Sequence, residues 1–183
     1  MPTSSDSNTT PQVLQTYALL QIASEALFNV EPGVAATAPG VGALQNIGFG
    51  TDGSVLTRGN DHSSRMTTEQ AKQFAQEWTV VSHQPNTATG FSATLFKYTG
   101  TSDSDRGLTN GQYVVSFRST EFIDDQARDS KATNELEVKE GGWAFGQIAD
   151  MQTWWNSLQG TLGTATVDVT GYSRRKSGSS LKS

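Results

Sequence analysis

Ser173 is the side chain in this sequence best placed to do chemistry. It ends the run Val167-Asp168-Val169-Thr170-Gly171-Tyr172-Ser173, in which β-branched residues predict a strand and Gly-x-Ser predicts a tight turn after it. A serine held at such a turn is a candidate nucleophile, but its hydroxyl is weak unless a positioned base takes its proton. The ten residues that follow it (183 − 173 = 10) contain no Asp, Glu or His, and the two histidines, His62 and His83, lie upstream.

Two further segments extend this pattern. Val114-Val115-Ser116-Phe117-Arg118-Ser119-Thr120-Glu121 resembles the Phe-Arg-Gly-Thr segment of class 3 lipases. Gly146-Gln147-Ile148-Ala149-Asp150-Met151-Gln152-Thr153-Trp154-Trp155 resembles the helix before the nucleophile strand in bacterial lipase-like proteins, where it leads into Val-Thr-Gly-Tyr-Ser-Leu-Gly-Gly-His. With the likeness running roughly from Tyr17 to Ser173, the chain resembles bacterial triacylglycerol lipases or phospholipase-like α/β-hydrolases.

This resemblance implies hydrolysis of carboxylic esters of lipids and gives three residues a role. Ser173 corresponds to the nucleophile, Thr120 to the oxyanion-hole residue, and the backbone N–H of Arg174 to the second oxyanion donor. Such donors stabilise the negative charge that acyl transfer builds on a tetrahedral oxygen. The chain departs from the family pattern at Ser119, which replaces a glycine, and at Arg174-Arg175-Lys176, which replaces Leu-Gly-Gly.

The missing triad acid and histidine leave three interpretations open. The chain is the truncated or frame-shifted product of a hydrolase gene, or a minimal esterase with a base from outside the family pattern. Alternatively, it is a non-catalytic remnant that binds lipid or a partner. We favour the first interpretation, because a serine without its base has little to work with, and we therefore expect little or no esterase turnover.

The elements that must position Ser173 follow from the apolar periodicity. Helical spacing predicts a helix over 11–29, and a Thr-x-x-Gln capping box at Thr67 predicts a second, with Ala71, Phe74, Ala75 and Trp78 on its apolar face. A third helix is predicted over 143–162. Alternating and β-branched residues predict strands, of which the second and third form an antiparallel hairpin, over 79–81, 90–98, 113–117 and 166–171. Residues 34–59 are expected to form a long loop.

These elements predict an α/β fold, a partial α/β-hydrolase-like mixed sheet with flanking helices. Residues 1–10 are expected to be a disordered leader, 11–173 the N-terminal portion of the hydrolase domain, and 174–183 a disordered tail outside the family pattern. The nucleophile strand is central in a hydrolase sheet. We therefore expect exposed apolar surface at Val167, Val169, Phe117 and Trp155, and self-association through an exposed sheet edge.

Other chemistry-bearing residues receive structural interpretations. We expect Asp61-His62 to be solvated loop residues, and His83, which ends a strand before a Pro/Asn turn, to be solvated in the same way. We expect Trp154 and Trp155 to place one ring in the core and one at its rim. Gly40-Val41-Gly42 lacks the strand and the third glycine of a dinucleotide site. An acidic cluster lacks the order of a calcium loop and is interleaved with Arg128, Lys131 and Lys139, so we expect a salt-bridged surface from Asp124, Asp125, Asp129, Glu135, Glu137 and Glu140.

Composition narrows the partners. A formal net charge of −5 argues against nucleic acid as the main partner, and zero cysteines exclude disulfides and thiolate metal sites. No apolar run approaches the roughly 20 residues needed to span a bilayer, and the polar start lacks a Sec-type signal pattern. We expect a lipid or ester substrate, no cofactor and no metal, with residence in the cytoplasm or export by a signal-independent route.

Overall fold

The computed structural model describes residues 10–26, 28, 44–45, 49, 53–57, 65–118 and 144–170. Its core is a five-stranded mixed sheet with the strand order β1-β2-β3-β4-β5. The strands are β1 (Leu44–Gln45), β2 (Trp78–Gln84), β3 (Ala93–Tyr98), β4 (Tyr113–Phe117) and β5 (Val167–Val169). β1 to β4 pair antiparallel in succession, and β4 pairs parallel with β5. This architecture confirms the α/β class.

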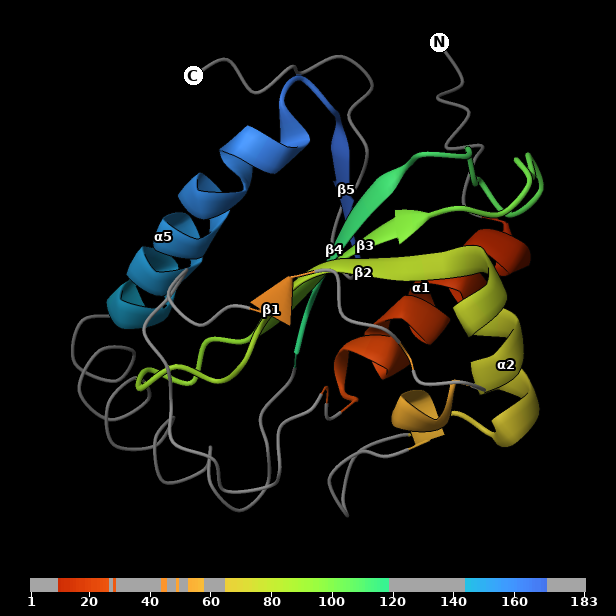
Figure 1. Cartoon of the computed structure of the whole chain (residues 1–183), viewed down its shortest axis with the longest axis horizontal. Coiled ribbons are helices and arrows are strands. Elements are labelled where there is room, and N and C mark those ends of the chain that lie inside the picture. The colour runs from red at the N-terminus through yellow and green to blue at the C-terminus, as the bar shows by residue number, and fades with distance from the viewer. Residues whose placement is uncertain are drawn as a thin grey trace, which may run out of the picture.

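Helices cover both faces of this sheet, as Figure 1 shows with α1 and α2 on one side and α5 on the other. The helical elements are α1 (Pro11–Ser24), the short 3-10 helix η1 (Ser54–Thr57), α2 (Thr68–Glu77) and α5 (Phe145–Leu162). The core is correspondingly split into two apolar clusters. One packs α1, η1 and α2 on the sheet around Leu20, Phe74 and Phe96, and the other packs α5 on the opposite face around Trp154, Leu158 and Leu95.

The helix starts follow the local sequence. Thr10 accepts a hydrogen bond from the Val13 N–H and precedes Pro11, which needs no N–H partner at the first helical position. The predicted capping box of α2 is confirmed, because Thr67 and Gln70 exchange hydrogen bonds of 3.0 and 3.3 Å. The predicted ends were less accurate: α1 ends at Ser24 instead of Asn29, and Trp78, predicted on the second helix, begins β2.

A bulge in β2 decides which side chains face α1. The register with β3 shifts between Val80 and Ser82, so both Val81 and Ser82 lie on the α5 face. Ser82 accepts a hydrogen bond of 3.3 Å from the Trp154 indole, and the next residue, His83, is turned to the opposite face beside Thr94. β2 therefore extends to Gln84, beyond the strand predicted over 79–81.

The β3–β4 hairpin, α5 and β5 agree with the prediction within a few residues. β4 has the predicted bounds, and β3 begins at Ala93 instead of Gly90. Trp154 is buried and Trp155 half-buried, so the core-and-rim prediction for this pair is confirmed. Within the described residues, no helix combines the length and apolarity that a membrane span requires.

Candidate functional site

A row of buried polar side chains crosses the sheet at one edge, on the face that α1 covers. β2 and β4 each run antiparallel to β3, and β4 runs parallel to β5. The carboxyl ends of β2, β4 and β5 therefore meet at the same edge. There the register aligns His83 with Thr94 and Thr94 with Ser116, and Ser116 contacts Thr170 just beyond β5. We call these four residues the polar row.

Hydrogen bonds connect the polar row in pairs. His83 Nδ1 and Thr94 Oγ1 lie 2.9 Å apart, and Thr170 donates to Ser116 Oγ across 2.7 Å. The Thr170 N–H donates to the Val115 carbonyl at 2.8 Å, which continues the parallel pairing past Val169. All four side chains of the row are buried, so these bonds satisfy groups that would otherwise be costly to remove from water.

Gln21 on α1 binds one end of the polar row. Its side-chain oxygen accepts from Ser116 Oγ at 3.1 Å, and its side-chain nitrogen donates to the Phe117 carbonyl at 2.7 Å. The Ser116 hydroxyl thus accepts a hydrogen bond from Thr170 and donates its single hydrogen to Gln21. One amide group therefore holds the end of β4 and, through Ser116, the end of β5.

An ion pair lies beside Gln21. Arg118 Nε and Glu25 Oε2 are 3.8 Å apart, and the two side chains are only 3% and 7% exposed. Glu25 caps the carboxyl end of α1, and Arg118 directly follows β4, with its N–H bonded to the Ser92 carbonyl. The attraction between two opposite charges buried together offsets part of their desolvation cost, and removing either one would leave the other charge buried without compensation. The pair fixes α1 to the sheet edge at which β4 ends.

His83 differs from its sequence-based interpretation. It was expected to be a solvated residue at the end of a strand. The strand is there, but the expectation of solvation was wrong, because His83 lies within β2 and is 1% exposed. Its ring meets the Phe28 ring edge-on, with centroids 4.8 Å apart. Burial, helped by the nearby Arg118 cation, lowers the pKa of His83 to about 3. The imidazole is therefore neutral at physiological pH and is a weak proton acceptor.

The residues to which the resemblance gave roles come after β4 and β5 in the sequence. Ser173, Thr120 and Arg174 lie outside the described residues, as do Asp61-His62, the Gly40-Val41-Gly42 segment and the acidic cluster at 124–140. The structure places the strands that precede them: β4 ends at Phe117 and β5 at Val169, side by side and parallel.

Sequence reasoning missed Gln21, Glu25 and Arg118 as part of this edge. Gln21 and Glu25 read as ordinary positions of an amphipathic helix, and Arg118 as part of a motif. The available signal was the hydroxyl residue in each of three otherwise apolar strand ends, namely Thr94, Ser116 and Thr170. Such residues on a buried face require polar partners from the covering layer, which here is α1.

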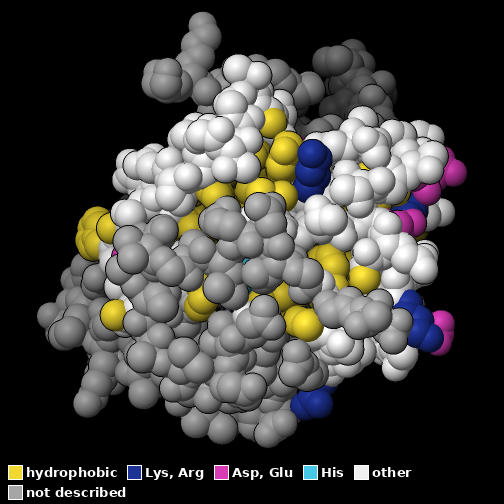
Figure 2. Space-filling model, in the orientation of Figure 1, with side chains coloured by type: hydrophobic (Ala, Val, Ile, Leu, Met, Phe, Trp, Pro, Cys, Tyr) yellow, Lys and Arg dark blue, Asp and Glu magenta, His cyan; other side chains and the backbone are white. Residues whose placement is uncertain are grey.

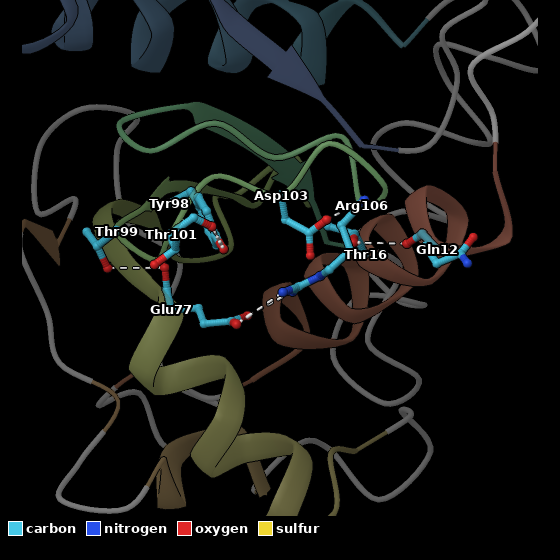
Figure 3. Close-up of polar contacts among 8 residues, drawn as sticks. All are labelled: Gln12, Thr16, Glu77, Tyr98, Thr99, Thr101, Asp103 and Arg106. Carbon is cyan, nitrogen blue, oxygen red and sulfur yellow. Dashed lines mark hydrogen bonds and ion pairs between the residues drawn. The ribbon is translucent and has the colours of Figure 1, made fainter.

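A second polar cluster lies where β3 ends and β4 begins, at the opposite edge. Figure 3 shows Arg106 reaching the Glu77 carboxylate at the end of α2, with two hydrogen bonds of 3.0 and 2.8 Å. The bond to Glu77 raises the pKa of Arg106. Tyr98 donates to the Thr101 carbonyl at 2.7 Å, and Asp103 accepts from the Asp105 and Arg106 N–H groups.

These contacts border an open hollow of about 580 Å³. Glu77 and Arg106 bind each other and Asp103 accepts from two backbone N–H groups, so the cluster holds the β3–β4 loop against α2. Among the described residues, no group of three or more His, Asp or Glu side chains could hold a metal ion. No protein-family model, curated protein or solved structure matches the chain.

Proposed function

We propose that this chain is built on the framework of a lipase-type serine hydrolase and carries its nucleophile and oxyanion segments. The observation that supports this most is the parallel pairing of β4 with β5, two strands joined through α5. Thr120 follows the end of β4 by three residues and Ser173 follows the end of β5 by four. Adjacent parallel strands deliver the residues after them to one sheet edge, which is the placement that acyl transfer requires.

The proposed chemistry assigns each residue one task. Ser173 Oγ attacks the carbonyl carbon of a lipid ester, and the N–H groups of Thr120 and Arg174 bind the oxyanion that forms. We assign a positioning task to the polar row, Gln21 and the Glu25–Arg118 pair, which contact the ends of β4 and β5. This task matters because a site loosened by about 1 Å loses much of its rate.

The described residues offer one candidate base for this site. His83 is the one histidine among the described residues, and it reaches the correct edge. Its pKa of about 3 makes it a poor proton acceptor at neutral pH, since an effective general base has a pKa near the working pH. We therefore expect Ser173 to be weakly activated and the hydrolysis of esters to be slow.

Hydrolysis of short-chain p-nitrophenyl esters tests this function. We expect little or no turnover above the uncatalysed rate, and no change in Ser173→Ala. Ser157→Ala is a matched control, because Ser157 donates only to a backbone carbonyl within α5. Robust turnover lost in Ser173→Ala but kept in Ser157→Ala would confirm the nucleophile and show that a base outside the described residues activates it. Turnover that survives Ser173→Ala would refute the proposed function.

A further inference from the structure

The turn that precedes β4 contains an asparagine followed by a glycine, Asn110-Gly111. A hydrogen bond of 2.9 Å from the Gln112 N–H to the Thr109 carbonyl closes it, and we call residues 109–112 the Asn110 turn. Gly111 has a φ of +85°, in the left-handed region that glycine adopts readily. Asn110 is exposed, so water reaches its side chain.

Asn110 and Gly111 can react with each other. When the Gly111 backbone nitrogen loses its proton, it can attack the side-chain carbonyl carbon of Asn110. A bond forms between these two atoms, the side-chain nitrogen leaves as ammonia, and a cyclic succinimide results. Water then opens the ring at one of its carbonyl groups and gives Asp or isoAsp. Glycine has no side chain to obstruct the attack, and water is the only other reactant, so the pair is a candidate deamidation site.

Hydrogen bonds hold both reacting groups in the folded chain. Asn110 Nδ2 donates to the carbonyls of Thr99 and Gly100 at 3.1 and 2.9 Å, which fixes the side-chain amide at the end of β3. The Gly111 N–H donates to the Tyr98 carbonyl at 2.8 Å. An amide proton held in this way is protected from base until the structure opens locally. Deamidation therefore requires that the Asn110 turn first separates from β3.

The Asn110 turn also connects the β3–β4 loop to β5. The Asn110 N–H donates to Ser102 Oγ at 2.9 Å, within that loop. Gln112 Oε1 accepts from the Thr109 N–H at 3.0 Å, and Gln112 Nε2 donates to Asp168 Oδ2 on β5 at 2.6 Å. A change that opens the turn therefore also disturbs the contact between this end of the hairpin and β5.

We propose that Asn110 is a deamidation site that the fold gates through the Asn110 turn, and that its product keeps the turn open. A carboxylate has no hydrogen to donate to the Thr99 and Gly100 carbonyls, so repulsion between oxygen atoms replaces two hydrogen bonds. IsoAsp in addition inserts its β-carbon into the main chain directly before β4. The proposal is independent of any role for Ser173.

The surroundings make the added charge unfavourable. Deamidation adds one negative charge to a chain whose formal charge is already −5, and it does so in a loop that contains Asp103 and Asp105. Figure 2 shows acidic and basic side chains together at the surface where the β3–β4 loop lies in Figure 1. Arg106 is the cation of this loop, and its guanidinium is bound to Glu77.

Mass spectrometry of the full chain, digested after incubation at pH 8 with and without urea, tests the gate. Deamidation at Asn110 should be at least about tenfold slower in the folded chain than in urea. Hydrogen exchange at the Gly111 amide should give an opening constant equal to that ratio. Asn156, which precedes Ser157 within α5, is the internal control and should react more slowly than Asn110 in urea. Equal rates at Asn110 with and without urea, or no reaction in either, would overturn the proposal.

Two pairs of variants separate the gate from its consequence. Ser102→Ala removes the acceptor of the Asn110 N–H and should speed deamidation of the folded chain at least about threefold, without effect in urea. Ser104→Ala is the matched control, because Ser104 is exposed and the loop uses its backbone carbonyl. Equal rates in these two variants would contradict the gate.

Asn110→Asp reproduces one product of the reaction. It should lower the hydrogen-exchange protection of the Gly111 amide at least about tenfold, whereas Asn156→Asp, which adds the same charge at an exposed position of α5, should not. Unchanged cooperative unfolding of the core confirms that both variants fold. Full protection of the Gly111 amide in Asn110→Asp would show that the product leaves the turn closed and would overturn the second half of the proposal.

Discussion

Thr170 donates a hydrogen bond of 2.7 Å to Ser116 and so joins the chain just beyond β5 to the end of β4. The bond lies on the buried α1 face, at the carboxyl ends of the two parallel strands. The proposed catalytic segments come directly after these strand ends in the sequence. Ser116 passes the contact to Gln21 on α1. Three elements distant in sequence are thus held at one point by side chains and not by the strand ladder alone.

Gln21→Ala should lower the free energy of unfolding by about 1–3 kcal/mol, because the buried Ser116 hydroxyl loses the acceptor for its hydrogen and the Phe117 carbonyl loses the amide donor. Gln15→Ala, at an exposed position of the same helix, should change it by less than about 0.5 kcal/mol. Urea unfolding followed by tryptophan fluorescence measures both values. Equal effects of the two substitutions would mean that Gln21 does not hold the strand ends.

His83 should make the protein lose stability in acid. In the folded state the pKa of His83 is about 3, below the usual value of 6.5. At pH values between these two, the unfolded chain binds a proton on His83 that the folded chain does not. This contribution is complete above pH 6.5 and is lost as the pH falls toward 3, at up to about 1.4 kcal/mol per pH unit.

His83→Gln removes that titration. The free energy of unfolding should be lower in the variant than in the wild type at pH 7, and the gap should narrow as the pH is lowered from 6.5 to 4. Taking the difference between the two proteins cancels the carboxylates that titrate in both. A gap that stays constant over this range would show that His83 is not buried in its neutral form.

The burial of His83 also shows where sequence reasoning stops. Ser82-His83-Gln84-Pro85 is a polar run before a proline, which is typical of a loop. It forms a strand because His83 and Gln84 pair with Thr94 and Ala93 of β3. Side-chain hydrogen bonds add to this pairing, from His83 to Thr94 and from Ser92, just before β3, to the Gln84 carbonyl. The bulge after Val80 then determines that the His83 side chain lies on the α1 face. No local sequence pattern predicts this bulge.

Elements whose patterns are local were predictable. The Thr67–Gln70 capping box is closed within one helical turn, and Tyr113–Phe117 is a continuous β-branched and aromatic run, so both could be identified without a partner. The site depends on long-range pairing instead. Gln21 and Phe117 are separated by 96 positions, and their contact follows from how α1 crosses β4, which periodicity does not encode.

Gly53 should tolerate no side chain. Its φ is +71°, and an added Cβ would stand 2.4 Å from the Ala71 carbonyl oxygen, where η1 meets α2. Gly53→Ala should cost more than about 2 kcal/mol of unfolding free energy. Gly160→Ala is the control, because Gly160 lies in α5 with nothing within 4 Å of an added Cβ, and it should stabilise by up to about 1 kcal/mol. A neutral Gly53→Ala would contradict the packing of η1 on α2.

The distance between the Thr120 backbone nitrogen and Ser173 Oγ in an experimentally determined structure tests the central claim most directly. Both atoms must reach one tetrahedral intermediate, in which Ser173 Oγ is bonded to the former carbonyl carbon and the donor lies about 3 Å from the oxyanion. The account therefore predicts a separation of no more than about 6 Å. The two residues should lie beside the polar row, at the edge marked by Thr170 and Ser116. A Thr120 nitrogen far across the molecule from Ser173 would contradict the hydrolase framework and leave the parallel β4–β5 pair without a catalytic meaning.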